Sequence, residues 1–384
     1  DAKLVQRSSE SQMEEEPTGP EQGGLGLAAP ATGAASLPLV EGPPQEGGTG
    51  VAIGGLNLAE VVRASMDRCV RIFVAGDRSH CGKTTISLAI LGGLEKAGVP
   101  PSKLAYIKPA TQCEAPDLLG KWCASKGVVC VCGKSAPLVF YSGFTREFLN
   151  GNAGTSASWM GAISAAVDRV AMGKSVVLVD GVGFPGVGSC VGISNAEVAR
   201  AARAPVLLVG KCAVGEAIDS YSLNAQFFSS QGVPVLGGVF NRGQTSGFYH
   251  WRDCAPHIRG FFAARRPREL VLGIVPELPA LDGARERIGG MDDRESLALA
   301  EANIDHAASH LDLAAIYLAA AADPWNRIGG GNSLGSPALG PLTSVPMAAA
   351  TATASHPNAK APNGRKRTRE EIEAGAKAIG ARGG

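Results

Sequence analysis

The chain has 384 residues, of which 45% are hydrophobic and 18% are charged, and its net charge is +1. This apolar content is enough to form a large core and excludes a wholly disordered chain. The balanced charge argues against a strongly basic protein, so we expect no specific nucleic-acid binding. No apolar run reaches the length of a membrane-spanning helix, so we expect no membrane partner.

The nine cysteines contain no CxxC pair, which argues against a zinc ribbon or a disulfide framework. Reduced thiols are typical of an intracellular protein, and we expect a cytoplasmic one. The segment RKRTR (365–369) resembles a nuclear-import peptide, so the nucleus is the alternative compartment. Because the chain begins at Asp1 rather than Met, the sequence predicts nothing about organellar targeting.

Composition divides the chain into three parts. Residues 1–66 and 327–384 are rich in glycine, proline and alanine without periodicity, and we predict disordered tails there. Residues 67–326 carry nearly all the strand and helix patterns, which predicts one domain.

Within this domain, short apolar runs alternate with longer segments at helical spacing. The predicted strands are 71–75, 103–107, 128–131, 175–180, 205–210, 233–240 and 270–275. Predicted helices include 157–172, 218–230 and 292–322, the last of which ends before Pro324. Strands that are buried on both faces and alternate with helices indicate an α/β fold with a doubly wound, mostly parallel sheet.

The strongest motif is GDRSHCGKTT (76–85), which follows the first predicted strand directly and opens a helical segment. Glycines let the backbone wrap around phosphate oxygens, and a helix N-terminus adds partial positive charge. Lys83 supplies a cation for the phosphates, and Thr84 supplies a hydroxyl for Mg²⁺. We therefore predict a phosphate-binding loop, with a chance GKT in a glycine turn as the alternative.

Eight loop residues are assigned to nucleotide binding, and Lys83 also to catalysis. They are Gly76, Ser79, His80, Cys81, Gly82, Lys83, Thr84 and Thr85. The Cys81 thiol lies close to Lys83 in sequence, and nearby positive charge lowers the pKa of a cysteine. A reactive thiol is therefore one interpretation, but we favour a packed spacer residue.

Two acidic residues are candidates for holding Mg²⁺ with Thr84. Asp180 ends an apolar strand and precedes a glycine, so its carboxylate would lie beside the phosphate loop at the carboxyl edge of the sheet. A turn-forming Asp-Gly is the alternative there. Asp117 follows Pro116 and has two equal interpretations, a metal-side acid or an ordinary helix start.

The spacing of five residues between the loop glycines, together with IKPATQ (107–112), VVLVDGVG (176–183) and GVFNRG (238–243), resembles dethiobiotin synthetase. The resemblance spans residues 70–322 and extends to the synthetase-like domain of phosphate acetyltransferases and to cobyrinate a,c-diamide synthase. It implies a P-loop NTPase fold, ATP and Mg²⁺ as cofactors, and a homodimer.

The same resemblance assigns further residues. It places Lys108 as a catalytic contact, Asn241 as an adenine contact, Asp117 as a metal-side acid, and Pro276 and Glu277 in a nucleotide-side loop. A solvated lysine and a turn asparagine are the alternatives for Lys108 and Asn241.

The chain departs from the synthetases at three positions. Arg78 and Ser79 replace an aspartate and a threonine in the loop, and Gln112 replaces a substrate-contacting serine. Diaminopelargonate, the substrate of the synthetases, is therefore not implied for this chain.

The segment 141–151 follows the third predicted strand, and a loop there would overhang the phosphate site. Thr145 and Arg146, with Gln112, are therefore candidates for contact with an anionic acceptor, and a partly buried connector is the alternative. The arginines Arg259, Arg265, Arg266 and Arg268 are interpreted as a solvated face.

The pattern as a whole predicts ATP-dependent phosphoryl activation of a carboxylate or carbamate on an unidentified small acceptor, by a ligase-like enzyme or ATP hydrolase. One alternative is an amide ligase of the cobyrinate type. The other is a nucleotide-dependent regulatory or scaffold module without ligase activity.

Overall fold

The computed structural model describes residues 58–64, 68–112, 117–283 and 287–327. The predicted tails lie mostly outside these ranges, with one correction. Helix α1 (Leu58–Ala64) falls inside the range 1–66 that we predicted as a tail. Its Val62 side chain is fully buried in the core, and the burial of this apolar side chain stabilises the helix against the domain. Within the described ranges, no helix is both long and apolar enough to cross a membrane.

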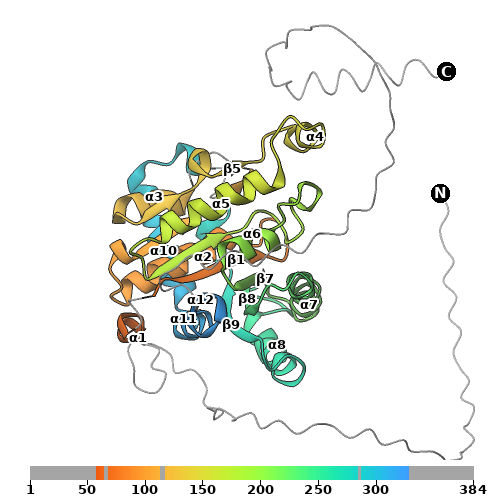
Figure 1. The fold of residues 1–384 in the computed structure, drawn as a ribbon. Coiled ribbons are helices and arrows are strands. Elements are labelled where there is room, and N and C mark those ends of the chain that lie inside the picture. Colours follow the sequence, from red (N-terminus) through yellow and green to blue (C-terminus); the bar gives the residue numbers. More distant parts are fainter. Residues whose placement is uncertain (1–57, 65–67, 113–116, 284–286, 328–384) are drawn as a thin grey trace, which may run out of the picture. The chain divides into compact units, whose positions relative to one another are not determined.

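The strands form a seven-stranded sheet and a two-stranded one (Figure 1). Their bounds are β1 (Val70–Gly76), β2 (Leu104–Ile107), β3 (Ala110–Thr111), β4 (Val129–Val131), β5 (Leu138–Val139), β6 (Val176–Asp180), β7 (Val206–Lys211), β8 (Val235–Gly243) and β9 (Leu270–Pro276). All seven predicted strands are present in the large sheet, in the order β4-β2-β6-β1-β7-β8-β9, and every described pair in it is parallel. This confirms the predicted α/β fold. The short pair β3 and β5 was not predicted.

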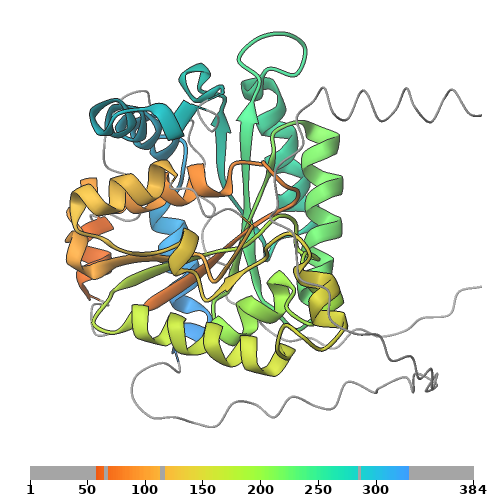
Figure 2. The same cartoon turned by 90° about the horizontal axis from the view of Figure 1, so that it is seen from above.

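The helices lie in layers on the two faces of the large sheet (Figure 2). Helices α2 (Lys83–Lys96), α3 (Leu118–Lys126), α10 (Asp293–Ala308) and α11 (Leu313–Ala322) contribute to the core on one face. Helices α4 (Phe144–Leu149), α5 (Ser156–Ala171), α6 (Asn195–Ala202), α7 (Val214–Ser230) and α8 (Trp251–Arg265) cover the other, and α12 (Pro324–Arg327) follows α11. Figure 1 shows α7 and α8 side by side near β8 and β9.

Strand β1 illustrates how the sequence specifies two cores. Ile72 and Val74 point into the core beneath α2, whereas Phe73 and Ala75 point into the core beneath α5 and α6. All four are almost completely buried. Side chains of a strand alternate between faces, so a continuous apolar run requires helices on both sides.

Strand β1 occupies the middle of the sheet, and this placement determines where a ligand would bind. The chain first builds β2, β4 and β6 on one side of β1 and then crosses over to β7, β8 and β9 on the other. Loops on the two sides therefore diverge at the carboxyl end of β1. In open α/β sheets, ligands bind in the crevice at such a switch point.

Two predicted segments need correction. The predicted helix 292–322 is interrupted between α10 and α11, because Leu311 bridges to Gly273 of β9 and the Asp312 N–H donates to the Leu272 carbonyl at 2.9 Å. The Asp312 side chain then caps α11. The segment 141–151 is not a simple loop, since it contains α4. Gly143 takes a left-handed φ of 98° and Phe144 is buried at the start of that helix.

Gly92 of α2 tests the close packing of α2 on α10. A Cβ at this position would collide with the Ile304 side chain, so we expect Gly92→Ala to lower the free energy of unfolding by about 1–3 kcal/mol despite the better helix propensity of alanine. Gly161→Ala in α5 is the matched control, because nothing lies within 4 Å of its added Cβ. Urea denaturation should show a gain of roughly 0.5–1 kcal/mol for the control. Equal gains for both variants would contradict the described packing.

Candidate phosphate-binding site

The predicted loop joins β1 to α2 at the switch point. Gly82 precedes α2 with a φ of 96°, and a Cβ on it would collide with the Asn241 side chain. A Cβ on Gly76 would lie 2.5 Å from the Cys81 sulfur, so both glycines are required by close approach. Because α2 starts immediately after the loop, the N–H groups of its first turn have no acceptor within the helix, which makes this end suited to an anion.

Lys83 is the cation of this loop, and its side chain is almost buried. Its ammonium group donates to the Gly183 carbonyl at 2.8 Å. Gly183 belongs to the turn after β6, so the lysine connects the loop to the segment that follows Asp180. Among the described residues this carbonyl is its hydrogen-bond partner, and an ammonium group can exchange a neutral carbonyl for the stronger contact that a phosphate offers.

Asp180 is the centre of the site. It is fully buried at the end of β6, in register with Val74 of β1. One carboxylate oxygen, Oδ2, accepts from the Tyr106 hydroxyl at 2.6 Å and from the Thr84 hydroxyl at 3.1 Å. The Lys108 ammonium lies 3.6 Å from the same oxygen. The structure thus brings the predicted residues Thr84, Lys108 and Asp180 together.

Tyr106 is a member of this cluster that the sequence did not reveal. Burial and the adjacent Asp180 carboxylate raise the pKa of its hydroxyl well above the ordinary value, so it stays a donor. In the sequence it stands in an apolar strand and is indistinguishable from a core residue. Its position two residues before Lys108, on the same face of the chain, is a weak signal.

The donor set fits a divalent cation. The second carboxylate oxygen of Asp180, Oδ1, is buried and has no hydrogen-bond partner within the described residues. A buried polar atom without a hydrogen bond is costly unless a ligand or ion compensates it. The Thr84 hydroxyl and a carboxylate are the oxygen ligands that Mg²⁺ prefers. The described part of the chain contains no group of three or more His, Cys, Asp or Glu side chains placed to hold a metal ion.

Asp117 has a structural contact of its own. Its side chain accepts from the Gly120 N–H at 2.8 Å and caps α3. Burial raises the pKa of this carboxyl, while the Gly120 N–H and Lys108 oppose the shift. The helix-start interpretation therefore describes the geometry, and a metal-side role stays a prediction.

Asn241 lies against the phosphate loop. Its buried amide donates to the Cys81 carbonyl at 3.0 Å, so a residue of β8 holds the loop in place. The predicted Pro276 ends β9 and Glu277 follows it, and two strands, β7 and β8, separate β9 from β1. The Glu277 N–H donates to the Gly243 carbonyl at 2.9 Å, two residues beyond Asn241. Adenine contact by these residues stays a prediction.

The remaining loop residues divide by exposure. Ser79 and His80 are exposed, and His80 takes a left-handed φ of 62°, which is strained for a residue with a side chain. The Thr85 carbonyl accepts from Asn303 of α10 at 3.0 Å, which ties the loop to the helix layer. Cys81 is fully buried, and this burial raises the pKa of its thiol.

Arg78 contacts residues that sequence reasoning did not connect. It bonds to Asp77, to the Ser220 hydroxyl and to Glu216 of α7. Its guanidinium therefore connects the loop to α7.

The predicted acceptor residues meet in one hollow of about 490 Å³. Pairing of β3 with β5 brings Gln112 beside Phe140, and Thr145 and Arg146 enter from α4. The aromatic walls and the facing segment around Val187 were missed, because their proximity depends on contacts between distant parts of the chain. A Cβ on Gly183 would contact Val187, so the hollow adjoins the turn that holds Lys83.

Comparison with models of protein families identifies the family of this chain. A family model described as "AAA domain" matches residues 70–285. Among solved structures, apo McdA of Cyanothece is 14% identical to this chain. The match covers 62% of this chain and 99% of the McdA chain, with a TM-score of 0.34. A nucleotide-binding protein from Archaeoglobus fulgidus, in complex with ADP, is also 14% identical. The match covers 67% of this chain and 96% of the Archaeoglobus chain, with a TM-score of 0.32.

The buried Cys81 thiol gives a test of the loop geometry. Because burial raises its pKa, little thiolate exists near neutral pH, and we expect iodoacetamide to modify Cys81 far more slowly than the exposed Cys190. Mass spectrometry of the native protein measures both rates. In denaturant the two cysteines should react alike. Equally fast modification of Cys81 in the native protein would contradict a closed, packed loop.

Proposed function

Because the chain belongs to the AAA domain family, whose model matches residues 70–285, we propose that it binds ATP with Mg²⁺ and activates a carboxylate or carbamate by phosphoryl transfer. The observation that carries the proposal is the Asp180 cluster. A buried carboxylate with one unpaired oxygen lies in hydrogen-bond contact with Thr84, one residue beyond the loop lysine. This is the arrangement that a phosphate-bound cation requires.

Each residue of the cluster has a defined task in this proposal. The loop N–H groups and Lys83 would hold the phosphates, and Lys83 would leave the Gly183 carbonyl to do so. Thr84 and Asp180 would hold Mg²⁺, which supplies charge stabilisation when bound. Tyr106 fixes the Asp180 side chain through its short hydrogen bond. Lys108, beside the same carboxylate, would face the acceptor and stabilise developing negative charge.

The acceptor would occupy the hollow formed by Gln112, α4 and the segment around Val187. This hollow is walled by the aromatic residues Phe140, Tyr141 and Phe144, and Arg146 is its cationic residue. The Arg146 side chain is exposed and forms no ion pair within the described part of the chain. Such a site fits a carboxylate with an apolar body. Its position beside the turn that holds Lys83 supports transfer from the loop to the hollow.

Phosphate release tests the proposed reaction. We expect the purified chain to hydrolyse Mg²⁺-ATP slowly, and an acceptor carboxylate to stimulate release. Diaminopelargonate with bicarbonate and a panel of aromatic and aliphatic carboxylates are the probes. Lys83→Ala should lower the rate by about 100-fold or more, because a cation that stabilises the transferred phosphoryl group is lost. Lys134→Ala, an exposed lysine outside the loop, is the matched control.

The outcomes separate the alternatives. Stimulation by an acceptor, lost in Lys83→Ala, supports a ligase-like enzyme. Slow release that no acceptor stimulates, again lost in Lys83→Ala, supports the regulatory or scaffold module instead. Absence of both ATP binding and hydrolysis would refute the phosphate-loop assignment.

Asp180→Asn tests the cation site separately. The amide keeps the shape of the carboxylate but removes its charge, so we expect Mg²⁺ to lose most of its effect on ATP affinity. Isothermal titration with ATP, with and without Mg²⁺, measures this difference. An Asp180→Asn variant with unchanged Mg²⁺ dependence would show that another group holds the cation. Circular dichroism of the variant controls for folding, because Asp180 is fully buried.

A further inference from the structure

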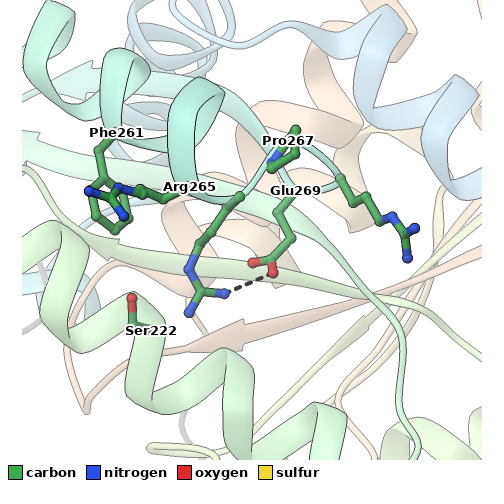
Figure 3. A pocket seen from close by; sticks show the side chains of 7 residues that line it. Ser222, Phe261, Arg265, Pro267 and Glu269 are labelled. Atoms are coloured by element: carbon green, nitrogen blue, oxygen red, sulfur yellow. Dashed lines mark hydrogen bonds and ion pairs between the residues drawn. The ribbon is translucent and has the colours of Figure 1, made fainter. Parts of the chain in front are cut away.

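A second hollow lies at the end of the sheet where β9 starts, opposite the carboxyl end of β1 that leads into the phosphate loop. Figure 3 shows the side chains that line this hollow. It measures about 840 Å³ and is open to solvent between α7 and the turn from α8 to β9. Its lining residues are Ser222, Phe261, Arg265, Arg266, Pro267, Arg268 and Glu269. Because β9 starts here and runs parallel to β1, this hollow is remote from the carboxyl ends where nucleotide would bind.

The three arginines of this hollow differ in their contacts. Arg266 forms an ion pair with Glu269 at 2.8 Å, and its guanidinium lies 5.6 Å from the centre of the Tyr221 ring. Arg265 and Arg268 are exposed and form no ion pair or hydrogen bond through their side chains with any described residue. Glu269 therefore neutralises one arginine, and two positive charges are left on the rim.

Helix electrostatics accounts for only part of this cluster. Arg265 is the last residue of α8, where a cation interacts favourably with the helix dipole. Arg268 lies beyond the helix, in the turn that leads to β9, and gains nothing from that dipole. Phe261 is only partly buried and forms an apolar wall, with Arg265 on the same side of the hollow (Figure 3). Two arginines without partners among the described residues, one of them beside a partly buried aromatic ring, are typical of a recognition surface rather than of a solvated helix end.

We propose that this hollow is a docking site for an acidic peptide segment of a partner protein. Acidic side chains pair with Arg265 and Arg268, and an apolar side chain of the segment packs on Phe261 and Pro267. The two arginines without a partner among the described residues give the hollow positive charge, which supports an anionic partner. The hollow is open to solvent, and Arg265 ends α8 whereas Arg268 lies in the next turn, which fits an extended ligand. The site is independent of the phosphate loop and does not depend on the proposed reaction.

The carboxylate inside the hollow favours a peptide over a nucleic acid. Glu269 lies among the arginines, and closely spaced phosphates would meet its negative charge (Figure 3). The carbonyl end of α8 adds partial negative charge at the same place. A peptide can space its acids so that they pair with Arg265 and Arg268 away from Glu269. Nucleic acid is therefore the competing ligand that the experiment must include.

Fluorescence anisotropy with the full chain tests the docking site. The probe is a fluorescein-labelled peptide of glutamates with a central leucine, and its glutamine counterpart is the uncharged control. We expect the acidic probe to bind, and the combined change Arg265→Glu with Arg268→Glu to weaken binding by about 10-fold or more, because like charges then meet. Arg294→Glu, an exposed arginine of α10 on the other face of the sheet, should leave binding within about 2-fold.

Three results would overturn the proposal. One is equal weakening by Arg294→Glu, which would indicate non-specific attraction. Another is failure of the acidic probe to bind better than the glutamine peptide. The third is binding of a single-stranded RNA oligonucleotide that depends on Arg265 and Arg268 while the acidic probe does not bind. Arg265→Gln with Arg268→Gln, checked by circular dichroism, should also weaken binding and guards against misfolding of the charge-reversed chain.

Discussion

The rest of the site depends on one buried charge, the carboxylate of Asp180. Removing a carboxylate from water is expensive, and the fold compensates one of its oxygens with Tyr106, Thr84 and Lys108. The other oxygen has no partner among the described residues. The register of β6 against β1 places this charge beside the start of α2, so sheet pairing determines the geometry of the site. A carboxylate that is only half compensated is a poor structural element but a suitable ligand for a cation.

Much of the fold follows from local sequence. Each strand of the large sheet is a short apolar run, and such runs are specified by their own residues. The phosphate loop was equally predictable, because its glycines, Lys83 and Thr84 form one local motif between a strand and a helix, although the residue packed against Gly82 is Asn241 of the distant strand β8. Asp180 was predictable for the same reason, since a polar residue that ends a buried strand stands out.

What the sequence did not reveal depends on contacts between distant segments. The interruption between α10 and α11 arises from hydrogen bonding of Asp312 to β9, whose partner is about 40 residues away in the chain. Tyr106 was missed because it stands in an apolar strand, where the sequence does not distinguish a tyrosine that bonds to a site residue from one that only packs in the core. Gln112, Thr145 and Arg146 were expected near one ligand, but their hollow exists only because β3 pairs with β5 and the segment around Val187 closes the other wall.

The most direct test of the central claim is a crystal structure of the chain with Mg²⁺ and a non-hydrolysable ATP analogue. The account predicts that the terminal phosphates lie in the loop 76–85, that the Lys83 ammonium has left the Gly183 carbonyl for a phosphate oxygen, and that the cation contacts Thr84 on the side of the unpaired Asp180 oxygen. A structure in which the nucleotide binds elsewhere, or in which Lys83 keeps its bond to Gly183 with the loop empty, would contradict it.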